Sequence, residues 1–374
     1  MAQIKNIVEK NNMEVRLKKS HTIFENKTHT ILTDDIFTYV DFYYKTHKKR
    51  LISENSGKPI VENYEFYWQQ AKNFYNAAKQ LPIESSPLPM YYAMLNAAKS
   101  LILYRTKNVD QTLKNLSNHG LHEYNNEENE KSNKCLNEIY IERFEFGVFV
   151  EFSELLDESF KTKWKSKREN ARYSVKKLLY QLAFIHRAYV TTYELPRNQE
   201  LFMPLVPGTT PTFYKFTDGK QYLVFDLQKN YFKASAINIP KEFEESIPEE
   251  FSVSGAGGFK IVSNSSIPMN NIKNDYSKYR REFQYIASPN RLWYLKRKTV
   301  NGEKIENINS LSLIIAITHR FSEIVRYKPE QLNRLLSGKE NWIIQEFLHL
   351  AMDQFFDEIA CEITGLEIMN TRCK

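Results

Sequence analysis

In two places in this sequence, a basic residue and a histidine are separated by four residues. Arg16 is paired in this way with His21, and Lys114 is paired with His119. A cation can stabilise negative charge on a phosphate, and a histidine can transfer a proton near neutral pH. Lysine lacks the planar fork with which arginine clamps a phosphate. His119 is therefore a candidate catalytic residue with Lys114 beside it, or alternatively a structural histidine that caps a helix.

Polar side chains also interrupt two apolar stretches that have helical spacing. They are His319, Arg320 and Arg326 in one stretch, and His186 and Arg187 in the other. Charged groups inside a protein must be paired, so the first interpretation is a core network whose acidic partners are Glu323, Asp353 or Glu358. The alternative is a binding site, because groups with perturbed pKa values gather at functional sites.

Two further stretches could contact phosphate groups. Residues 45–50 form a compact positive cluster that includes Lys48, Lys49 and Arg50, and it is either a solvated loop or a phosphate-contacting patch. Residues 254–258 are the most glycine-rich point of the chain, but no Lys-Ser or Lys-Thr follows them and the next residues resemble a strand. This pattern supports neither a P-loop nor a dinucleotide-binding loop, and it favours a flexible loop. We predict no cofactor.

The composition limits the classes of partner. The net charge of +7 over 374 residues favours acidic partners without requiring nucleic acid, and the 23 Tyr and 24 Phe supply either core or base-stacking surfaces. The three cysteines show no zinc-ligand spacing, so we predict no metal site. The N-terminus lacks the apolar core of a signal peptide, and no apolar run is long enough to cross a bilayer. We therefore expect a cytoplasmic protein that has no membrane partner.

Helical patterns occupy both ends of the chain. A cap within Thr33-Asp34-Asp35 is expected before a short amphipathic helix, and residues 61–80 carry one apolar face. Ser85-Ser86-Pro87 is expected to begin a helix so apolar that it should lie in the middle of a bundle. Residues 107–134 are expected to form a surface connection with one short helix, and residues 144–150 a strand or buried turn. Residues 311–319 and 341–364 are the strongest C-terminal helical patterns, and Gly365 is a natural cap.

The middle of the chain has a different pattern. Between residues 201 and 297, short apolar-polar alternations are separated by turn signals such as Asp218-Gly219. We predict an α+β fold, predominantly α, in which N- and C-terminal helices form one helical bundle around an inserted β-rich module. The expected divisions are a basic N-terminal segment (1–60), a helical region (61–195), the β-rich module (196–300) and C-terminal helices that pack on the first helical region (301–374).

Several peptides resemble the YaaC-like family of bacterial proteins, over most of the chain from residue 60 onward. They are residues 119–121, 182–188, 291–295, 317–329 and 342–365. This resemblance implies no particular activity. Residues 85–122 and the C-terminal helices are also similar to HEPN-type helical bundles, which include bacterial RNases with an Arg and a His separated by four residues. Because these bundles also include noncatalytic relatives, the similarity implies either metal-independent RNA cleavage or a noncatalytic role.

Three functions follow from these patterns. The first is binding of RNA or DNA, or of a protein, with a role in phage defence suggested because related helical proteins often appear beside defence genes. The second is HEPN-type metal-independent endoribonuclease activity. The third is a regulatory or structural subunit that docks another protein through an aromatic patch. The sequence gives no prediction of the oligomeric state.

Overall fold

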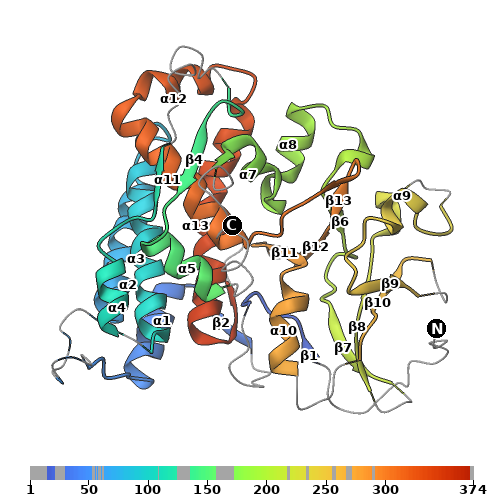
Figure 1. Ribbon diagram of the computed structural model, residues 1–374, viewed down its shortest axis with the longest axis horizontal. Helices are drawn as coiled ribbons and strands as arrows, with labels where there is room; N and C mark the ends of the chain where they lie inside the picture. Colours follow the sequence, from blue (N-terminus) through green and yellow to red (C-terminus); the bar gives the residue numbers. More distant parts are fainter. Residues whose placement is uncertain are drawn as a thin grey trace.

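Helices gather at one side of the molecule and most of the strands at the other, as Figure 1 shows for this computed structural model. The structure describes residues 15–21, 30–52, 55, 57, 60, 63–107, 109–123, 135–156, 172–216, 220–232, 236–254, 258–266, 272–288 and 291–370. The Asp218-Gly219 turn and residues 255–257 of the glycine-rich stretch lie outside these ranges. The α+β prediction is confirmed.

Helix α3 (Pro87–Arg105) lies at the centre of the helical part, as its apolar sequence predicts. Twelve of its residues are buried, and it packs against α2 (Tyr64–Lys79), α11 (Ser310–Tyr327) and α13 (Asn341–Thr364). Burying one large apolar side chain contributes roughly 1.5–3 kcal/mol, so a helix that is buried on nearly all sides holds its neighbours together. Pro87 begins α3 as expected, although the Ser86 side chain does not cap the helix and its hydroxyl contacts Ile83 O.

The remaining helices lie around α3, in the segments that connect its neighbours, or in the β-rich part. Asp35 caps α1 (Ile36–Thr46) through bonds from the backbone amides of Phe37 and Thr38. The α13 helix ends at Gly365, whose φ of +67° is the left-handed conformation expected of a glycine cap. The other helices are α4 (Val109–Asn115), α5 (Val148–Leu156), α7 (Val175–Tyr180), η2 (Ala183–Ile185), α8 (His186–Thr192), η3 (Arg197–Gln199), α12 (Pro329–Leu336) and, in the β-rich part, η4 (Lys229–Tyr231), α9 (Lys241–Glu244) and α10 (Ile272–Arg280).

Two sheets form the β-rich part. One has the strand order β1-β7-β8-β10-β9, and the other has the order β11-β12-β6. Phe225, Phe283 and Trp293 belong to the core that these sheets enclose. The strands are β6 (Phe202–Pro204), β7 (Thr212–Lys215), β8 (Gln221–Asp226), β9 (Phe251–Val253), β10 (Lys260–Ser263), β11 (Phe283–Ile286) and β12 (Leu292–Lys296), together with β1 (Val15–Arg16) from the N-terminal segment.

Three further sheets complete the fold of the described residues. Strand β15 (Glu367–Asn370) pairs in parallel with β2 (Thr30–Thr33), and β13 (Thr299–Val300) pairs with β14 (Glu303–Lys304). The third sheet contains β3 (Leu121–Glu123), β4 (Tyr140–Arg143) and β5 (Arg172–Ser174). The prediction of a strand or buried turn at residues 144–150 is wrong, because residues 144–146 are exposed outside any strand and α5 begins at Val148. Among the described residues, no helix is long and apolar enough to cross a bilayer.

Candidate functional site

The loop that carries His119 is fixed by a close approach of two backbone segments. The amides of Val148 and Phe149, at the start of α5, donate to the carbonyls of Asn118 and His119 at 2.9 and 3.0 Å. Gly147 makes this possible: its φ is +124°, and a Cβ there would lie 2.5 Å from the amide nitrogen of Gly120. The α5 terminus therefore positions the His119 backbone.

His119 lies beside a second histidine and a buried tyrosine. The Tyr91 hydroxyl lies 2.7 Å from Nδ1 of His119, and the rings of Tyr91 and His319 are 4.8 Å apart between centroids. The two imidazole rings are 5.9 Å apart. His119 is exposed, whereas Tyr91 and His319 are buried. The structure thus brings together two of the histidines that the sequence singles out, from α11 and from the loop before β3.

Burial and positive neighbours keep both imidazoles neutral. Partial burial, together with the charges of Lys99 and Arg326, lowers the pKa of His119. Burial, reinforced by His119 and Arg320, lowers the pKa of His319 to about 3. The pKa of the Tyr91 hydroxyl is raised well above its usual value, mainly by burial. At neutral pH, His119 is therefore an uncharged group at the surface, next to two cations.

The hydrogen bond of Tyr91 decides which nitrogen of His119 carries the proton. A buried hydroxyl needs an acceptor, and among the described residues the hydrogen-bond partner of the Tyr91 oxygen is Nδ1 of His119. If Tyr91 donates to Nδ1, neutral His119 carries its proton on Nε2. The exposed edge of His119 then offers an N–H donor, which suits an anion or carbonyl oxygen. It does not offer the lone pair that a general base needs.

A salt-bridge network lies next to this cluster. Arg320 bonds to Glu123 of β3 and lies 3.4 Å from Glu323, and Lys328 lies 2.8 Å from Glu123. Burial raises the pKa of Glu323. Arg320 therefore acts in a core network, the first of the two interpretations suggested by the sequence. Arg326 is instead exposed, and its guanidinium lies over the ring of Tyr327 at 5.0 Å.

Exposed aromatic rings flank the His119 loop. Phe144 and Phe146 are 45% and 53% exposed, and they directly precede Gly147, which abuts Gly120. The amide of Phe144 also donates to Gly120 O at 3.0 Å. The ring of His122 stacks on the Phe144 ring at 4.1 Å between centroids. Exposed aromatic rings of this kind can stack on the bases of a single-stranded nucleic acid.

The remaining candidates lie elsewhere in the fold. Lys114 is exposed on α4. Arg16 pairs with Thr212 in the β-rich part, while His21 is buried, its amide donating to Glu362 and its ring 3.9 Å from Glu358. These placements make His21 part of a buried polar network.

The positive cluster at residues 48–50 lies on the surface beside α2 and α3. Lys48, Lys49 and Arg50 are all exposed. The Lys49 ammonium donates to Tyr104 O at 2.7 Å and lies 5.4 Å from the centre of the Tyr104 ring. This lysine is held against the protein, whereas a loop residue that contacts phosphate would project from it.

His186 and Arg187 share one carboxylate. Nε2 of His186 lies 3.2 Å from Glu200, and Arg187 lies 3.4 Å from it. These three residues line a cleft of about 200 Å³ between α8 and the β-rich part. This cleft is a second candidate site, which the sequence indicates only through the His186-Arg187 pair.

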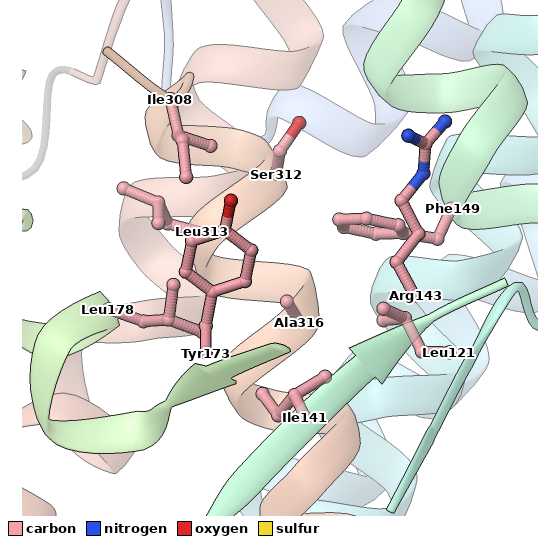
Figure 2. Close-up of a pocket in the computed structure, with 10 residues that line it drawn as sticks. All are labelled: Leu121, Ile141, Arg143, Phe149, Tyr173, Leu178, Ile308, Ser312, Leu313 and Ala316. Atoms are coloured by element: carbon pink, nitrogen blue, oxygen red, sulfur yellow. The ribbon is translucent and has the colours of Figure 1, made fainter. Parts of the chain in front are cut away.

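A second pocket, which is apolar, is too small for a ligand. Figure 2 shows Tyr173 and Arg143 on opposite sides of it, with Ser312 and Ala316 of α11 along its wall. Its volume of about 20 Å³ is room for one water molecule. Across the described ranges, no group of three or more His, Cys, Asp or Glu side chains is placed to hold a metal ion.

Several residues of these sites have no signal in the sequence. Tyr91 is one of three tyrosines on α3, and Tyr92 and Tyr104 carry the same hydroxyl, so nothing in the sequence distinguishes it. Lys99, Glu123 and Glu200 are ordinary charged residues until the fold places them beside histidines or arginines. A buried tyrosine on an apolar helix is the one hint available, because its hydroxyl requires a partner.

Comparison with known proteins identifies a family but no characterised relative. No curated protein and no solved structure matches the chain. The family model described as YaaC-like Protein matches residues 24–363, which include both histidines of the cluster, the α5 terminus and the cleft. The chain therefore belongs to the YaaC-like family.

Proposed function

We propose that this YaaC-like protein binds single-stranded nucleic acid at the surface around His119. The observation that carries the proposal is the exposed imidazole of His119, which two cations influence and exposed phenylalanine rings flank. The Nε2 proton of His119 and the guanidinium of Arg326 would contact phosphate oxygens, and Phe144 and Phe146 would stack on bases. The net charge of +7 would favour the encounter.

A single strand suits this surface better than a duplex. Stacking on Phe144 and Phe146 requires bases whose faces are accessible, which a paired helix does not offer. Among the described residues, the surface around His119 also lacks a dense basic stripe, because nearby Arg320 and Lys328 are already paired with Glu123. Affinity should therefore come from a few phosphate contacts together with stacking.

Cleavage of the bound strand is the second candidate, favoured by the exposure and lowered pKa of His119. A general base would need a lone pair on Nε2 to remove a proton from a 2′-hydroxyl. The hydrogen bond to Tyr91 supports the opposite tautomer. We therefore expect binding without cleavage.

One set of variants separates the two functions. The amide nitrogen of glutamine can replace the Nε2 donor of histidine but cannot shuttle a proton. His119→Gln should keep the affinity for a fluorescently labelled single-stranded RNA close to wild type, and His119→Phe should weaken it. RNA that is cleaved by the wild type in the presence of a chelator, and left intact by His119→Gln, would instead establish the nuclease.

We also propose a role in phage defence, because related helical proteins often appear beside defence genes. Plaque counts on cells that express the wild type or His119→Phe would test it. We expect the wild type to reduce plaque formation and His119→Phe to protect less. Equal plaque counts with and without the wild-type gene, across a panel of phages, would contradict a defence role.

A further inference from the structure

The cleft beside His186 lies at the junction between the helices and the β-rich part. Its walls come from α8 and η3 on one side and from β6, η4 and β12 on the other. Figure 1 shows α8 next to the strands β6 and β13 at this junction. A ligand here would contact both parts of the fold, and such junctions are common places for small-molecule sites.

The charges in the cleft favour an anion. Arg187 and Arg197 are both exposed at its walls, and Glu200 is the one carboxylate among its lining residues. The Arg197 guanidinium lies 5.0 Å from the centre of the Tyr231 ring and bonds to Tyr231 O, which fixes its position. The two guanidinium groups outnumber the single carboxylate, so the cleft is suited to a phosphate. Guanidinium groups can bind a phosphate through several charge-assisted hydrogen bonds.

Glu200 offers a different contact from the bottom of the cleft. The residue is buried, and its carboxylate interacts with His186 at 3.2 Å and Arg187 at 3.4 Å. Burial raises its pKa, but the hydrogen bond and charge of His186 and the charge of Arg187 leave the pKa below its usual value. An ionised carboxylate accepts about four hydrogen bonds, so it can also accept from the hydroxyl groups of a sugar.

Buried histidine atoms and aromatic rings complete the lining. His186 is 5% exposed, and within the described part of the chain its Nδ1 has no hydrogen-bond partner. Phe202 is fully buried, and the half-buried ring of Tyr294 lies 6.4 Å from it. A planar group in the cleft can pack against Tyr294, as bases do against aromatic side chains.

We propose that this cleft binds a nucleoside monophosphate, with the phosphate on Arg187 and Arg197, the ribose hydroxyls on Glu200 and the base against Tyr294. The volume of about 200 Å³ admits a small molecule but not a nucleic-acid strand. This site is separate from the His119 surface, and it does not depend on the function proposed there.

The test is calorimetric titration of the full-length protein with the four ribonucleoside monophosphates, adenosine and inorganic phosphate. At least one monophosphate should bind more tightly than both adenosine and phosphate. Arg187→Gln and Arg197→Gln should each weaken it on the order of 10-fold. Arg334→Gln, an exposed arginine on α12, is the matched control and should leave it unchanged.

Other results would overturn the assignment. The first is that no monophosphate binds. The second is that a monophosphate and inorganic phosphate bind with equal affinity. The third is that Arg187→Gln and Arg334→Gln weaken binding of the monophosphate equally. Because a mononucleotide could instead bind at the nucleic-acid surface, the titration is repeated with His119→Phe. Loss of binding in that variant would move the ligand to the His119 surface and contradict the cleft. Circular dichroism of each variant verifies that it is folded.

Discussion

Tyr91→Phe tests how the protein controls the proton on His119. The substitution removes a hydroxyl that lies 2.7 Å from Nδ1 of His119 and leaves the buried ring in place. A hydrogen bond of this kind contributes about 1 kcal/mol to the neutral imidazole, which corresponds to roughly 0.7 pKa units. We therefore expect the pKa of His119 to rise by about that amount, because only the neutral form of the imidazole loses a hydrogen bond. Burial and the charges of Lys99 and Arg326 oppose the charged form in both proteins.

Nuclear magnetic resonance with ¹⁵N-labelled histidine measures both parts of this prediction. In the wild type, the long-range ¹H–¹⁵N pattern of His119 should be that of the Nε2–H tautomer, and in Tyr91→Phe the two tautomers should mix. The pH titration of the same signals gives the pKa. A wild-type His119 that carries its proton on Nδ1, or a pKa that does not move in Tyr91→Phe, would refute the reasoning.

Three further predictions concern stability. His319 stays neutral in the fold, while its pKa is 6.5 in the unfolded chain. Lowering the pH from 7 to 5 should therefore cost the wild type about 2 kcal/mol of unfolding free energy, a loss that His319→Gln should not show. Equal losses for the two proteins in urea titrations would contradict this. Gly147→Ala should destabilise the fold by about 1–3 kcal/mol more than Gly302→Ala, because both glycines have positive φ but only Gly147 of the two lies against another backbone segment. Equal urea-unfolding midpoints for the two variants would show that this contact is unimportant. Glu362→Met removes a buried carboxylate that lies 2.7 Å from the guanidinium of Arg105, and it should cost about 3–5 kcal/mol. The double variant with Arg105→Met should lose less, and a double variant as unstable as the single one would contradict the pairing.

The long helices could be predicted from the sequence because their signals are local. Residues 341–364 are helical as expected, and Gly365 ends the helix in a left-handed conformation, since apolar spacing and a glycine cap are properties of a short window. Strands β7, β8 and β12 also lie between residues 201 and 297, where the alternating pattern predicts strands. Here again, the alternation and the turn residues lie within each segment.

What the sequence could not provide depends on contacts between distant residues. The apolar, aromatic run after Gly147 resembles a strand, yet it folds as α5 because it packs against α3 and α11. Strand β1 has only two residues and exists through its pairing with β7, almost two hundred positions away. His119 and His319 meet across a similar separation. Their residue types mark them as candidates, but only the fold makes them neighbours.

The most direct test of the central claim is fluorescence anisotropy of a labelled single-stranded RNA, measured over a range of salt concentrations. Arg326→Gln should weaken binding roughly 5-fold and reduce the slope of log affinity against log salt by about 0.7, as expected for one lost phosphate contact on a single strand. His119→Phe should also weaken binding, whereas His119→Gln and the control Arg334→Gln should not. No salt-dependent binding by the wild type, or the same loss in Arg334→Gln as in Arg326→Gln, would contradict a nucleic-acid surface around His119.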